Sequence, residues 1–161
     1  MSYILILDCY YGYFKLVEKE NCTVTLCKDY SYETYANVWV KDPVKHALIQ
    51  YLTEFKNIIE LESKDQLHSA ITKHLGGTNY PEIHKAFTEV WSSKREYVLQ
   101  SYQKFCKKYN IEYDYESHLN RMQQDELEDK ITFIKQCIKE KLNKIHAYRN
   151  ELTTLKARAK L

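Results

Sequence analysis

The sequence predicts an α/β domain with a small, mostly parallel central sheet and a helical C-terminal half that ends in a long, basic, amphipathic helix. The apolar run 3–9 predicts a strand buried on both faces, as at the centre of an α/β sheet. Only 3 glycines and 2 prolines occur among 161 residues, which favours long helices over a many-stranded barrel. From Glu128 onward no residue breaks a helix.

Three further regions have the pattern of strands. Residues 13–19 and 22–28 alternate apolar and polar side chains on either side of Glu20-Asn21, and this predicts a hairpin. Residues 38–40 predict a short strand after a polar, tyrosine-rich loop at 29–37, and residues 57–62 predict a second buried strand.

Helices are predicted over most of the rest. Asp42-Pro43 is typical of a helix start, and an apolar stripe continues from there to Phe55. Ser63 is expected to cap a helix that runs to Leu75, where two glycines follow. The remaining expectations are a helical stretch from Pro81, a short strand at 88–91, a helix at 94–109 and an unassigned segment at 110–122.

The last helix carries a heptad pattern. Apolar residues recur every seven positions at one seam position, and the second seam position is apolar except at Lys141. The residues are Ile131, Ile138, Ile145, Leu152 and Ala159, then Ile134, Lys141, Tyr148 and Leu155. Both a coiled coil and a helix lying on its own domain fit this pattern. We expect a globular head at 1–127 that is continuous with a helix at 128–161.

Charge and cysteine content limit the possible partners and the cellular compartment. Residues 131–161 contain eight Lys/Arg and two Glu, so this segment could contact an acidic partner, RNA or a membrane surface, or form a solvated face. The five cysteines form no disulfide or zinc framework, which predicts reduced thiols in the cytoplasm or an organelle matrix. We expect neither a signal peptide nor a membrane span. The 15 tyrosines are spread along the chain, which favours half-buried packing over a base-stacking surface.

Several polar residues follow the predicted elements in a suggestive order. Asp8 ends the first strand, Ser63 follows a later one, Lys94 opens a helix, and Asp125-Glu126 begins an acidic cluster. This order resembles the haloacid dehalogenase-like hydrolase superfamily. The resemblance implies a Mg²⁺-dependent phosphohydrolase in which Asp8 is the nucleophile, Ser63 and Lys94 bind phosphate, and Asp8, Asp125 and Glu126 hold the metal.

The sequence departs from that superfamily at two places. The superfamily has a second Asp as general acid/base two residues after the nucleophile, and Tyr10 occupies that position here. A strand should also precede the last acidic motif, yet residues 118–123 are weakly apolar. A catalytically inactive member therefore remains open beside an active one.

Two other functions use the same residues. The order of Asp8, Glu60 or Glu62, and Asp125/Asp129 is similar to that of ribonuclease H-like nucleases, which hold two metal ions between carboxylates. The basic helix would suit their nucleic-acid substrate.

The third function involves no chemistry. The acidic run 125–129 also favours the positive end of a helix, and a compact head with a heptad helix is typical of a non-catalytic assembly subunit. Such a subunit would bind a protein partner, or itself, through 131–161.

Overall fold

The computed structural model describes residues 1–28, 34–75 and 80–160 of the chain. The chain divides into two compact units, Met1–Leu119 and Asn120–Leu161. The first unit is called the head below. Its elements are β1 (Tyr3–Asp8), β2 (Tyr13–Glu18), β3 (Cys22–Lys28), β4 (Thr34–Asp42), β5 (Ala47–Glu54), β6 (Ile58–Leu61), α1 (Leu67–Leu75), α2 (Tyr80–Thr88) and α3 (Ser92–Lys108). Helix α4 spans Tyr115–Ala159 and supplies nearly all of the second unit.

The strands form two antiparallel sheets of three strands each, in the orders β2-β1-β6 and β3-β4-β5. The predicted central, mostly parallel sheet is therefore wrong. Parallel strands need long crossover connections, usually helices. Here a turn of four residues joins β1 to β2, short 3-10 turns at Lys19–Asn21 and Phe55–Asn57 carry the chain between the sheets, and the helices come after the last strand.

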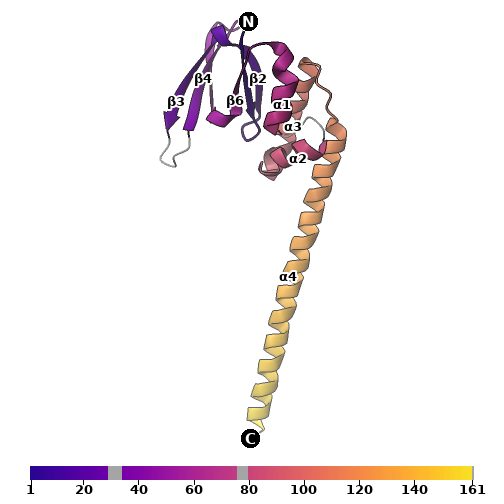
Figure 1. Ribbon diagram of the computed structural model, residues 1–161. Coiled ribbons are helices and arrows are strands. Elements are labelled where there is room, and N and C mark those ends of the chain that lie inside the picture. The colour runs from indigo at the N-terminus through magenta and orange to yellow at the C-terminus, as the bar shows by residue number, and fades with distance from the viewer. Residues whose placement is uncertain (29–33, 76–79, 161) are drawn as a thin grey trace. The chain divides into compact units, whose positions relative to one another are not determined.

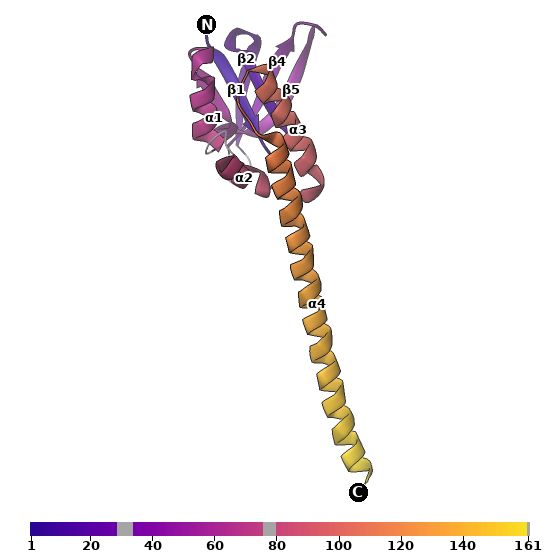
Figure 2. The same ribbon diagram turned by 90° about the vertical axis from the view of Figure 1, so that its right-hand side faces the viewer.

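Strand β1 lies at the centre of its sheet and is buried on both faces, as the apolar run predicted. Ile4 and Ile6 pack against Ala36, Val38 and Val40 of β4, so the two sheets lie face to face. On the other face Phe14, the partner of Leu7 across β1 and β2, contacts the rings of Phe87, Tyr102 and Phe105 from α2 and α3. Figures 1 and 2 show the resulting layers of sheet, sheet and helices.

The predicted hairpin of 13–19 with 22–28 is wrong, although both segments are strands. The 3-10 turn between them moves the chain to the second sheet, so β2 pairs with β1 and β3 pairs with β4.

The helix predicted from Asp42 is also wrong. Asp42 does accept hydrogen bonds from the N–H groups of Val44 and Lys45, but it caps the turn between β4 and β5 rather than a helix. In β5 the alternate residues Ile49, Tyr51 and Thr53 are less exposed than the residues between them. The segment therefore has the two-residue period of a strand and not the period of the predicted helical stripe.

Smaller differences concern the helices. Residues 34–37 belong to β4 rather than to a loop, and residues 29–33 and 76–79 lie outside the described part. Thr88–Trp91 forms no strand, because α2 ends at Thr88 and α3 begins at Ser92. The strand at 57–62 and the helices after Ser63 and Pro81 are confirmed, as is the last helix, which begins earlier, at Tyr115.

A chain of polar rings lies within the helical layer of the head. The hydroxyl of Tyr113 lies 2.5 Å from Nδ1 of His118, and Nε2 of His118 lies 3.0 Å from Nδ1 of His84. His118 is fully buried. Burial, with a smaller contribution from repulsion by His84, lowers the pKa of His118 to about 4.

We predict that this histidine makes the head less stable in mild acid. An unfolded histidine has a pKa of about 6.5, so between that pH and about 4 the unfolded chain binds more protons than the folded one. The contribution is fully present above pH 6.5 and is lost as the pH falls toward 4. Urea unfolding at pH 7 and at pH 5.5 should show a drop in the free energy of unfolding that His118→Gln reduces. The exposed His46→Gln should leave the drop intact, and an equal drop in both variants would refute the assignment.

Candidate functional site

The predicted nucleophile Asp8 is a buried structural carboxylate at the end of β1, with 2% of its surface exposed. Its Oδ2 accepts hydrogen bonds from the hydroxyl of Thr53 and, at 3.5 Å, from Nδ2 of Asn57. Its Oδ1 accepts the N–H of Tyr11 at 3.0 Å, which closes the β1–β2 turn. Asp8 therefore connects β1 to the end of β5 and to the 3-10 turn that follows.

A pocket of about 280 Å³ adjoins Asp8, and Tyr10, the exposed residue at the acid/base position, also lines it. Cys9 lines the same pocket. Burial, and less strongly the charge of Asp8, raises the pKa of the Cys9 thiol to about 12. A thiol with so high a pKa remains protonated near neutral pH, so Cys9 is a poor nucleophile.

The two predicted phosphate-binding residues do not line this pocket within the described part of the chain. Ser63 precedes a short 3-10 turn and makes no side-chain capping hydrogen bond there. Lys94 lies in the first turn of α3, where its Nζ is 5.6 Å from the centre of the Trp91 ring. Asp8 and Tyr10 thus line one pocket, and Lys94 is linked to Tyr10 through the ring of Trp91.

The predicted metal ligands Asp125 and Glu126 lie on α4, in the second unit. Oδ1 of Asp125 is 3.2 Å from Nε of Arg121, one helical turn earlier. Among the residues described here, no group of three or more His, Cys, Asp or Glu side chains could hold a metal ion. Asp8 belongs to the first unit and Asp125 and Glu126 to the second, so the Mg²⁺ site stays a prediction.

The acids of the nuclease hypothesis are likewise divided between the two units. Glu60 on β6 is exposed and forms an ion pair with Lys19, and Glu62 and Asp129 are exposed as well. Phosphohydrolase and nuclease activity both remain predictions, and neither gains an assembled set of catalytic side chains here.

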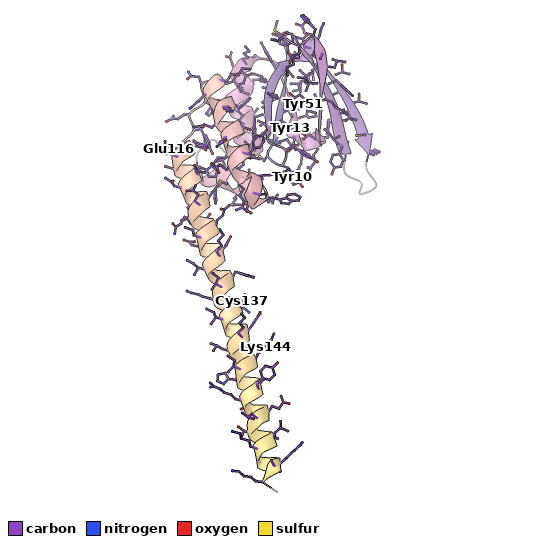
Figure 3. All side chains as sticks on the ribbon, turned by 180° about the vertical axis from the view of Figure 1, so that it is seen from behind. Tyr10, Tyr13, Tyr51, Glu116, Cys137 and Lys144 are labelled. Carbon is purple, nitrogen blue, oxygen red and sulfur yellow. The ribbon has the colours of Figure 1, made fainter. Side chains whose placement is uncertain are left out.

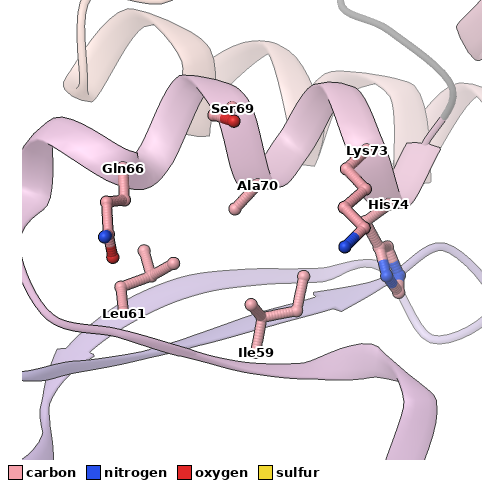
Figure 4. Close-up of a pocket in the computed structure, with 7 residues that line it drawn as sticks. All are labelled: Ile59, Leu61, Gln66, Ser69, Ala70, Lys73 and His74. Atoms are coloured by element: carbon pink, nitrogen blue, oxygen red, sulfur yellow. The ribbon is translucent and has the colours of Figure 1, made fainter.

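A larger pocket of about 520 Å³ lies between β6 and α1 (Figure 4). Ile59 and Leu61 from β6 form one apolar side, Ala70 from α1 lies opposite them, and Lys73 and His74 line one end. Burial is the main cause that lowers the pKa of His74, which favours its neutral form. The pocket therefore combines apolar contact with the polar side chains of Gln66, Ser69, Lys73 and His74.

The strongest functional feature is the seam of α4, by which we mean the apolar residues at the two heptad positions. Eight large apolar side chains lie there, and their exposed fractions run from 44% for Ile145 to 68% for Tyr148. They are Leu127, Ile131, Ile134, Ile138, Ile145, Tyr148, Leu152 and Leu155. Monomeric proteins seldom leave so long an apolar row in water, so the seam has the character of an interface.

The residues that flank the seam are mostly basic. Six of them are Lys or Arg and two are Glu; Cys137 and Leu142 complete the flanks. The charged residues are Lys130, Lys135, Lys144, Arg149, Lys156, Arg158, Glu128 and Glu151. Figure 3 labels Cys137 and Lys144 on this helix. In coiled coils such flanking charges govern the choice of partner and the response to salt.

Two seam-related residues were not predicted from the sequence. Leu127 precedes Ile131 by four residues, so extending the heptads one step back would have found it. Leu142 lies on the flank beside Lys141 and is 51% exposed, which widens the apolar stripe where the lysine interrupts it. Continuous helix from Tyr115 explains why the pattern already holds at Leu127.

Comparisons with known proteins add no family to this picture. The chain matches no protein-family profile, no curated protein sequence and no solved structure. In the described residues no helix combines the length and apolar character required to cross a lipid bilayer.

The Asp8 cluster yields a stability prediction. Thr53→Val removes the hydroxyl that donates to Asp8 and leaves a buried carboxylate short of one donor, which should cost about 1–3 kcal/mol of unfolding free energy. Thr23→Val, at an exposed position on β3, is the matched control and should change stability by less than about 0.5 kcal/mol. Urea unfolding measures both, and equal values would show that the cluster is not a stabilising contact.

Proposed function

We propose that this protein is a non-catalytic assembly subunit whose helix α4 forms a two-stranded coiled coil through the seam, with a second copy of the chain as its partner. The exposed row of eight apolar residues at heptad spacing supports this proposal. Ile at three first seam positions, combined with Leu at the second positions 127 and 155, favours two strands. A seam that two copies share is self-complementary about a two-fold axis.

The free energies of the opposing contributions favour pairing with a second copy despite the basic flanks. Fully burying a large apolar side chain contributes about 1.5–3 kcal/mol, so a half-exposed one gains about 1 kcal/mol on pairing. Eight such residues in each copy outweigh flanking like-charge pairs, which cost about 0.3–0.5 kcal/mol each. The flanks therefore weaken the dimer and make it sensitive to salt, but they do not prevent it.

The helix itself also needs a partner. Helices in proteins derive most of their stability from packing an amphipathic face rather than from intrinsic propensity. Every residue of α4 from 138 to 159 is exposed, so tertiary packing within the chain stabilises this part of the helix little. A coiled coil supplies the missing contact.

Replacing a central seam residue should abolish the assembly. We expect the full chain to have twice its monomer mass by light scattering at micromolar concentration, and Ile138→Asp to reduce it to the monomer mass, because a carboxylate would be buried at the seam. Gln136→Asp, on the opposite face of the helix, introduces the same residue and should leave the dimer intact. A monomeric wild-type chain would refute self-association, and equal behaviour of both variants would refute the seam.

The lysine within the seam should limit the affinity. Lys141→Leu restores an apolar layer and should tighten the dimer about tenfold or more, at some loss of a unique register. Lys139→Leu, on the outer face, should not. Sedimentation equilibrium at several salt concentrations gives the dissociation constants. It should also show the wild-type dimer tightening as salt screens the basic flanks. A dimer that weakens with salt would contradict this account of the flanks.

A further inference from the structure

A row of aromatic side chains crosses the head, independent of the helix seam. Trp91, Tyr10, Tyr11, Tyr13 and Tyr51 form this aromatic row. Successive ring centres are 6.0, 5.0, 5.5 and 5.2 Å apart, and the rings of Tyr11 and Tyr13 are stacked with an angle of 6° between them. The row joins the start of α3 to the β1–β2 turn and then to β5; Figure 3 labels three of its members.

Much of this aromatic surface faces water. Trp91 is 62% exposed, and Tyr10 and Tyr11 are close to half exposed. Tyr97 of α3, 63% exposed, lies beside the turn: a Cβ atom at Gly12 would be 3.2 Å from the Tyr97 ring. Glycine at position 12, with its φ of 77°, therefore permits both the turn and the approach of this ring. Tyr10 and Tyr11 are half-buried and pack against neighbouring rings, as expected of the tyrosines, whereas Tyr97 is more exposed than that expectation.

A basic groove of about 480 Å³ adjoins the row, between β2 and α3. Four tyrosines and three lysines line it, and no acidic side chain of the described residues does so. They are Tyr13, Tyr51, Tyr97, Tyr109, Lys15, Lys104 and Lys108. Helical spacing explains the set, because positions 97, 101, 104, 105 and 108 share the face of α3 that looks onto β2.

We infer that the aromatic row and this groove together bind single-stranded nucleic acid. The exposed rings of Trp91, Tyr10 and Tyr97 suit unstacked bases, and the lysines of the groove, without a nearby acid among the described residues that line it, suit the phosphates between those bases. A duplex keeps its bases stacked on each other and could not use the rings. An acidic peptide would use the lysines but not the rings, so the combination selects the single strand.

Fluorescence anisotropy with the full chain and a fluorescein-labelled 12-nucleotide oligo-dT or oligo-U tests this. The length lies within the roughly 4–16 nucleotides that one such surface covers. We expect both strands to bind, and the logarithm of the affinity to fall with log salt at a slope near −2, for three lysine–phosphate contacts. Trp91→Leu and Tyr97→Leu should each weaken binding about tenfold, whereas Trp91→Phe, which keeps a ring, should bind nearly as well as the wild type.

Two comparisons decide where the strand binds. The double substitution Lys104→Ala/Lys108→Ala should weaken binding and reduce the salt slope, while Lys139→Ala, on the outer face of the basic helix α4, combined with Lys160→Ala, just beyond its end, should change neither. The reverse result would place the strand on α4 and overturn the inference. Absence of binding at low salt would also overturn it, and so would equal binding of a labelled 12-residue poly-glutamate peptide that Trp91→Leu leaves unchanged.

Discussion

The exposed apolar seam of α4 is the feature on which the proposed function depends. A helix of 45 residues with large apolar side chains at heptad spacing in contact with water carries an unfavourable solvation free energy along its length. Pairing with another helix removes that cost, and identical seams on two copies meet the requirement without any other component. The basic flanks and Lys141 work against pairing, but by less than the seam favours it. The proposed dimer should therefore have an affinity that depends on salt.

In the head, strand β1 is the element on which the packing of the neighbouring layers depends. Its alternating side chains serve two layers, with Ile4 and Ile6 against the second sheet and the opposite face toward the helices. Asp8 ends this strand and binds Thr53 and Asn57, so one buried carboxylate fixes the chain where it passes from one sheet to the other. That structural role accounts for a conspicuous acid at a strand end without invoking catalysis. The surface of the head carries the aromatic row, so the two proposals assign separate binding roles to the two units.

The sequence predicted the elements with the strongest patterns and failed where two periods competed. β1, β6, α3 and the heptad helix each have one dominant pattern, and each is present. The segment that became β5 carries both a helical stripe and an alternation, and pairing with β4 selects the strand, which local propensity does not anticipate. The relative direction of the strands was predicted wrongly for a related reason: a buried apolar run looks the same in a parallel and an antiparallel sheet. The site prediction depended on that direction, because only parallel strands bring their carboxyl ends to one edge. The seam was predictable because it depends on one helix alone, whereas the aromatic row joins the β1–β2 turn to Tyr51 and Trp91, which are distant in the sequence.

Hydrogen exchange along α4, at protein concentrations above and below dissociation, tests self-association through the seam most directly. If two copies pair, amides between Leu127 and Leu155 should be protected at high concentration and should exchange much faster on dilution, while β1 keeps its protection at both concentrations. Fast exchange of α4 at every concentration, or protection that dilution does not change, would contradict self-association through the seam.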